Sequence, residues 1–173
     1  MRKNNLTKLT VSALCLSLCL VLPFLTGQIP QIGNMLLPMH FPVFICALLC
    51  GAGYGAIVGF VAPILRYIMF NMPQPPVGIP MAFELMTYGL VAGFVYKKLG
   101  HKKYSEYKAL LVSMLAGRIV WGGVSSIVAL AGAKAFSVEL FIAGGFVKAV
   151  PGIILQLLII PPIVKRLNKT INR

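Results

Sequence analysis

The sequence predicts an all-α integral membrane protein, a bundle of six transmembrane helices, from three observations. Apolar residues make up 58% of the 173 residues and charged residues only 11%, whereas soluble domains are roughly a quarter charged. The apolar residues fall into long runs, and the basic residues cluster between these runs. Such a chain has too little polar surface for a soluble domain and too much apolar surface for a disordered one. We therefore treat residues 1–173 as one membrane domain.

Six apolar segments are candidates for crossing a bilayer, which takes about 20 helical residues. They are residues 9–26, 40–51, 54–70, 78–96, 109–131 and 138–164. The first follows a basic start like that of a signal peptide, but it lacks a small-residue cleavage site, so we expect it to be retained. The second is short, and only the stretch 51–53 (Gly-Ala-Gly) joins it to the third, which predicts a tight helical hairpin. Prolines within these segments are compatible with membrane helices, because neighbouring helices satisfy the freed carbonyls.

The distribution of basic residues predicts the orientation. The chain has 16 Lys and Arg residues against 3 acidic ones. Twelve of the basic residues form clusters at the N-terminus (Arg2, Lys3, Lys8), between the fourth and fifth segments (Lys97, Lys98, Lys102, Lys103, Lys108) and at the C-terminus (Lys165, Arg166, Lys169, Arg173). Six crossings place all three clusters on one side, which the positive-inside rule assigns to the cytoplasm, together with both termini. The clusters show little aromatic interleaving, so nucleic acid is not an expected partner.

Four ionisable residues fall inside the apolar segments: Arg66, Glu84, Arg118 and Lys148. Each costs a few kcal/mol or more at membrane depth and should face the bundle interior. Counting along the helices puts Arg66 and Glu84 at one depth, where they could pair, and Arg118 and Lys148 near the midplane. Three cations against one carboxylate leave a positive surplus, which predicts water or an anionic ligand beside them. The alternative is snorkelling, or pairing within the protein alone.

The loop before the second segment is polar but uncharged, as suits a cover over a small polar ligand. It contains Asn34 and leads to His40, although a lone histidine is more often an interfacial residue than a ligand contact. Trp121, the single tryptophan, lies near the midplane of the fifth segment, where it could stack on a ligand or simply pack. The cysteines fall as two pairs four residues apart without accompanying histidines or carboxylates, so we read them as small apolar helix residues and predict no metal and no cofactor.

Several signatures of catalysis are missing from the sequence. It has no GxxxxGK[ST] phosphate loop, no HExxH motif and no aspartate. The chain is therefore not expected to hydrolyse ATP or to be an enzyme.

The stretch LLPMHFPVFICALLCGAGYGAIVGFVAPILRYIMF, followed by GIPMAFELMTYGLVAGFVYKKLG, resembles the substrate-binding S components of energy-coupling factor (ECF) vitamin transporters of Gram-positive bacteria. The resemblance covers about residues 28–100 and implies a multi-pass protein of the cell membrane. It implies that the chain captures a vitamin from outside and docks on a coupling protein with two ATPases. The implied substrate-binding positions are Asn34, His40, Glu84, Tyr88, Arg118, Trp121 and Lys148, beside Arg66 from the charge argument. The implied docking patch on the first helix is Ala13 and Ser17.

The resemblance is closest to pantothenate-type S components, and pantothenate is an anion, as the charge surplus favours. Riboflavin, pyridoxine or a queuosine precursor are alternative ligands. A stand-alone secondary transporter is the alternative class, with Glu84 as its one candidate coupling carboxylate inside the membrane.

Overall fold

The computed structural model describes residues 2–26, 35–100, 102–132 and 149–171, and every long regular element in these ranges is helical. The elements are α1 (Arg2–Val21), the 3₁₀ helix η1 (Leu22–Thr26), α3 (His40–Cys50), α4 (Ala52–Phe70), α5 (Pro75–Leu99), α6 (Ser105–Ala131) and α8 (Val150–Ile171). Five of the helices are long and apolar enough to cross a membrane, and α3 is a shorter apolar one. The predicted all-α fold is confirmed, and the described residues form six α-helices. The part of the predicted sixth segment before residue 149 lies outside the described residues, and a membrane crossing by the short α3 stays a prediction.

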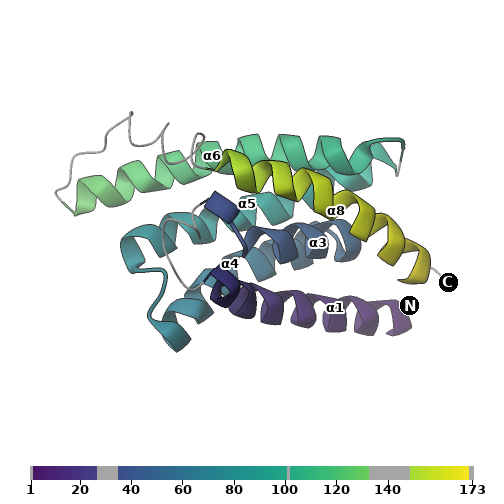
Figure 1. Cartoon of the computed structure of the whole chain (residues 1–173), viewed down its shortest axis with the longest axis horizontal. Helices are drawn as coiled ribbons and strands as arrows, with labels where there is room; N and C mark the ends of the chain where they lie inside the picture. Colours follow the sequence, from purple (N-terminus) through teal and green to yellow (C-terminus); the bar gives the residue numbers. More distant parts are fainter. Residues whose placement is uncertain (1, 27–34, 101, 133–148, 172–173) are drawn as a thin grey trace.

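The helices run back and forth along one axis, and both chain termini lie at the same end of the bundle (Figure 1). We call that end the proximal end, and the opposite end the distal end. The distal end contains the end of η1, the α4–α5 connection and the last turn of α6. Lys97 and Lys98 occupy the last turn of α5, at the proximal end. The assignment of this end to the cytoplasm stays a prediction.

The predicted hairpin between α3 and α4 is present. Gly51 joins the two helices with φ of 102°, a left-handed value that favours glycine, and its amide donates to the Ala47 carbonyl. A side chain at Gly55 would clash, because its Cβ would lie 2.6 Å from the Ala47 Cβ. The second and third apolar segments are therefore one tightly packed unit.

The helices α4 and α5 touch backbone to backbone along a seam of glycines. A Cβ at Gly59 would lie 2.3 Å from the Leu85 carbonyl oxygen, and a Cβ at Gly89 would lie 2.2 Å from the Gly55 carbonyl carbon. Small residues at such positions let membrane helices approach closely. Close packing between the two helices thus accounts for these glycines.

The four cysteines are all buried and free, and they lie on α1 and α3. The Cys46 Sγ lies 3.4 Å from the Ser12 Oγ, and the Cys50 Sγ lies 3.5 Å from the Lys8 carbonyl oxygen. Their reading as small residues that pack between helices agrees with this arrangement.

Candidate functional site

Four buried polar side chains from three helices meet inside the bundle: His40 at the start of α3, Glu84 and Tyr88 on α5, and Arg118 on α6. The Arg118 Nη1 lies 3.0 Å from the Glu84 Oε1, an ion pair within hydrogen-bonding distance. The Tyr88 hydroxyl donates to the same oxygen at 2.6 Å. We call these four residues the polar cluster. All four stood among the residues expected from the sequence.

The fold positions the polar cluster through one aromatic side chain and one glycine. Glu84 and Tyr88 are four residues apart, so they lie on the same face of α5. The Tyr88 ring stacks on Phe44, with centroids 5.0 Å apart. It also fills the space beside Gly117, where a Cβ would lie 2.1 Å from the Tyr88 Cε1. Gly117 immediately precedes Arg118, so this close contact also sets where the guanidinium enters the cluster.

His40 is the member of the polar cluster whose hydrogen bonding is incomplete. Its Nε2 lies 3.9 Å from the Glu84 Oε1, which is too long for a hydrogen bond. Neither ring nitrogen has a hydrogen-bond partner among the described residues, although both are buried. Buried polar atoms without partners are uncommon and costly, so the imidazole is a position that a bound polar group could complete.

The charges of the polar cluster balance. The Arg118 guanidinium faces the Glu84 carboxylate, one positive charge against one negative. Trp121 lies beside this pair, with its ring centroid 5.9 Å from the guanidinium carbon of Arg118. Either partner alone would be a costly buried charge, so each of the two depends on the other. The expected surplus of positive charge is therefore absent from this cluster itself.

The predicted pairing of Arg66 with Glu84 is wrong. Arg66 is buried, but its Nη1 donates to the Leu20 carbonyl at the end of α1. In the 3₁₀ turn that follows, the residue three positions after Leu20 is Pro23, which has no amide hydrogen to offer that carbonyl. The rings of Phe24 and Phe70 flank the guanidinium at 5.0 and 5.4 Å. Arg66 thus joins α1 to α4, away from the polar cluster.

The other predicted positions divide into two groups. Asn34 and Lys148 lie outside the described residues. Ala13 and Ser17 lie on an exposed face of α1, where the Ser17 hydroxyl donates to the Ala13 carbonyl at 3.0 Å. That face is open to a partner, and the docking assignment stays a prediction.

Two buried polar features escaped the sequence reasoning. Gln156 on α8 is buried, and its Nε2 has no partner among the described residues. A single glutamine in the apolar run IILQLLII was the signal for it. Near the proximal end, the Tyr96 hydroxyl donates to the Glu106 Oε1 at 3.4 Å and accepts from the Asn168 Nδ2 at 3.2 Å. That network ties α5, α6 and α8 together.

Comparison with known proteins gives one family. The model for the ECF transporter, substrate-specific component family matches residues 7–164. Nothing among curated proteins matches the chain. The match covers most of the chain and includes the polar cluster and all five long helices, apart from the ends of α1 and α8. The chain therefore belongs to the family of substrate-specific components of ECF transporters.

Proposed function

We propose that this chain captures a water-soluble vitamin at the cell membrane and delivers it to an ECF module, a coupling protein with two ATPases. Family membership supports a substrate-binding subunit. The observation that carries the proposal is the buried ion pair of Glu84 and Arg118 beside an incompletely bonded His40. Ionisable groups inside the membrane are costly, and where a protein keeps them they usually mark a functional site. The exposed Ala13 and Ser17 face of α1 is the proposed surface for the coupling protein.

Pantothenate is the proposed ligand, on the sequence resemblance. Because Glu84 already neutralises Arg118, a carboxylate ligand has to compete with Glu84 for that guanidinium or bind Lys148. The hydroxyl and amide groups of pantothenate would suit the free nitrogens of His40. Riboflavin, pyridoxine or a queuosine precursor are the alternative ligands within the same function.

The first experiment identifies what the purified chain holds. Mass spectrometry of the denatured protein should release one small vitamin, and calorimetry with that compound should show binding without ATP. We expect Lys148→Ala to weaken this binding by about 1.5–3 kcal/mol, the usual range for a hydrogen bond to a charged group. Unchanged affinity in Lys148→Ala, and in an Arg118 variant that folds, would remove the anion-binding claim.

The second experiment tests the partnership. Cells that express the chain should take up the vitamin only when the coupling protein and its ATPases are co-expressed. Uptake by the chain alone in liposomes with an ion gradient would contradict the proposal. If Glu84→Gln then abolished that uptake, the chain would be a secondary transporter.

A further inference from the structure

Two buried polar side chains on neighbouring helices have nitrogens without hydrogen-bond partners: His40 on α3 and Gln156 on α8. Each residue is 1% exposed. The Gln156 Nε2 and both ring nitrogens of His40 lack partners among the described residues. The helices α3 and α8 pack against each other. Because unpartnered buried polar atoms are uncommon and costly, we looked for one cause that explains both.

The register between α5 and α8 places Gln156 at the level of Glu84. Both helices run toward the proximal end, where the Asn168 Nδ2 donates to the Tyr96 hydroxyl at 3.2 Å. Gln156 lies twelve residues before Asn168, and Glu84 lies twelve residues before Tyr96. At 1.5 Å per residue, both side chains start about 18 Å distal of this contact.

Both residues also belong to buried stripes, in which every fourth residue faces the interior of the bundle. Asn168 is the next position of the α8 stripe, and Tyr96 ends the α5 stripe, so the two stripes meet at the proximal end. Gln156 therefore lies on the interior side of α8. The stripes are Glu84, Tyr88, Ala92 and Tyr96 on α5, and Gly152, Gln156, Ile160 and Val164 on α8.

A second contact fixes the level of Gln156 from the distal side. Gly152 packs so closely against the chain before α3 that a Cβ there would lie 2.5 Å from the Met35 carbonyl oxygen. That segment leads to His40, whose amide donates to the Leu37 carbonyl at 3.0 Å. Gln156 follows Gly152 by about 6 Å in the proximal direction, which is also the direction in which α3 runs from His40. Two independent contacts thus place Gln156 at the level of the polar cluster.

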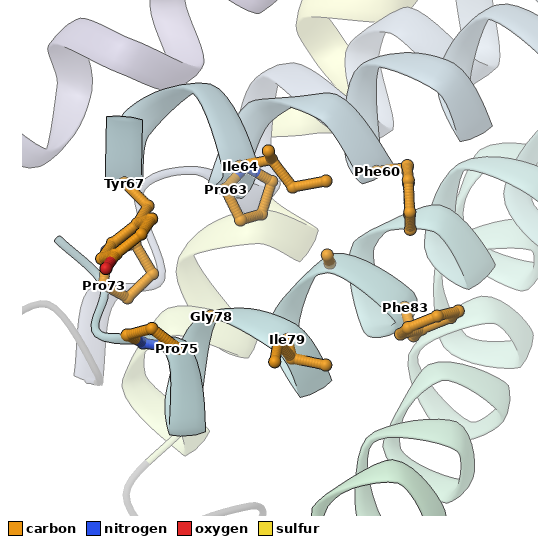
Figure 2. Close-up of a pocket in the computed structure, with 10 residues that line it drawn as sticks. Phe60, Pro63, Ile64, Tyr67, Pro73, Pro75, Gly78, Ile79 and Phe83 are labelled. Carbon is orange, nitrogen blue, oxygen red and sulfur yellow. The ribbon is translucent and has the colours of Figure 1, made fainter. Parts of the chain in front are cut away.

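The cavity between α4 and α5 offers no comparable hydrogen-bonding groups (Figure 2). Its walls include Phe60, Ile79 and Phe83, and of the described residues that line it only Tyr67 carries a polar side-chain atom. Neither Gln156 nor the polar cluster lines this cavity. A water-soluble ligand would lose its hydration there with little gain in hydrogen bonds. The unused hydrogen-bonding capacity lies instead beside the polar cluster.

The hydrogen-bonding types of the two side chains select the class of ligand group. The amide nitrogen of Gln156 only donates, whereas a neutral imidazole donates from one nitrogen and accepts at the other. Glu84 and Arg118 already balance each other, so a further ionic group would stay without a counter-charge. An uncharged group that both donates and accepts, a hydroxyl or an amide, satisfies all three nitrogens.

We propose that Gln156 is a further ligand-binding residue, and that together with His40 it binds a hydroxyl or amide group of the ligand and not its carboxylate. We call this pair the Gln156–His40 subsite. The inference rests on the proposed function, because it needs a water-soluble ligand inside the bundle.

The first test measures binding to full-length variants by calorimetry in detergent. Pantothenate, riboflavin, pyridoxine and a queuosine precursor are each titrated into the wild-type chain, and the compound that binds is the probe. We expect Gln156→Leu to weaken its binding about tenfold, the effect of one hydrogen bond. The melting temperature should stay equal or rise slightly, because the substitution removes an unpartnered amide. If Gln156→Leu does not fold, Gln156→Met takes its place.

Asn168→Leu is the matched control. Asn168 continues the same stripe of α8, but it lies near the proximal end and already donates to the Tyr96 hydroxyl. The control should keep the affinity for the probe and lower the melting temperature. The two variants thus separate a contact with the ligand from a contact that only stabilises the bundle.

Two further measurements test the subsite itself. In the double variant Gln156→Leu, His40→Phe, the loss of affinity should be smaller than the product of the two single losses, because both residues contact the same ligand group. If pantothenate is the probe, panthenol is titrated as well. A hydroxymethyl group replaces the carboxylate in panthenol, so Gln156→Leu should weaken its binding by the same factor.

Unchanged affinity in Gln156→Leu, or an equal loss in Asn168→Leu, would overturn the inference. So would single losses that multiply fully in the double variant, or a loss that affects pantothenate and spares panthenol. In each of these cases the wild-type chain still binds its vitamin, so the proposed function stands. A wild-type chain that binds none of the four compounds would contradict the proposed function, and this inference with it.

Discussion

At the scale of single residues, the polar cluster has one carboxylate oxygen at its centre. The Glu84 Oε1 takes the Arg118 guanidinium and the Tyr88 hydroxyl, and His40 stands just beyond hydrogen-bonding distance. Three of these residues thus depend on one another, while the fourth has unused bonding capacity. We therefore expect replacing Arg118 to lower the stability of the protein, and replacing His40 to leave it unchanged or slightly higher.

We expect Arg118→Ala to destabilise the protein by about 3–5 kcal/mol, because it leaves the Glu84 carboxylate buried without its partner. Thermal unfolding in detergent measures the loss. The double variant Glu84→Gln, Arg118→Met removes both charges and should regain most of the stability. A double variant no more stable than Arg118→Ala would mean that the pair does not act as a unit.

We expect His40→Phe to weaken vitamin binding about tenfold and to leave thermal stability equal or slightly higher. Its ring nitrogens have no partners among the described residues, so removing them relieves a desolvation cost instead of breaking a bond. Calorimetry measures the affinity, and unfolding measures the stability. Tyr88→Phe is the control, since it should lower stability by breaking its bond to Glu84. A large loss of stability in His40→Phe would contradict this role.

At the scale of helices, the α4–α5 seam holds the two walls of the bundle at a fixed distance. In this seam, glycines of one helix touch the backbone of the other. An added methyl group would therefore clash with backbone atoms, and the whole helix would have to move to make room. The seam therefore sets the level at which Glu84 lies along the bundle.

Gly59→Ala should destabilise the protein by about 1–3 kcal/mol, the usual cost of overpacking, because its Cβ would lie 2.3 Å from the Leu85 carbonyl oxygen. Gly53→Ala on the same helix is the matched control, since nothing lies within 4 Å of its Cβ. The control should be neutral or stabilise slightly. Equal melting temperatures for the two variants would show that the seam is not close-packed.

At the scale of the whole molecule, both termini and the last turn of α5, with Lys97 and Lys98, lie at the proximal end, while the α4–α5 connection lies at the distal end (Figure 1). We expect the proximal end to be the cytoplasmic one, on the distribution of basic residues. The helix layout alone gives an even number of crossings, and the charge distribution chooses the direction.

Reporter fusions test the direction. Green fluorescent protein fused to the C-terminus should fluoresce, and alkaline phosphatase fused there should be inactive, because both report a cytoplasmic position. Alkaline phosphatase inserted after Asn71, in the α4–α5 connection, should be active. The reverse pattern would place the proximal end outside and would contradict the positive-inside assignment.

The sequence alone determined the class of protein, the helices and the hairpin between α3 and α4. Hydropathy and glycine spacing report these features locally, residue by residue. It also indicated that Glu84 and Arg118 face the interior, because a charged side chain that faces lipid costs a few kcal/mol or more. Only the tertiary structure decided which charges meet. Depth along a helix is readable by counting residues, but the rotation of each helix about its axis is not. The rotation of α4 places Arg66 against the Leu20 carbonyl, and the rotation of α6 places Arg118 beside Glu84.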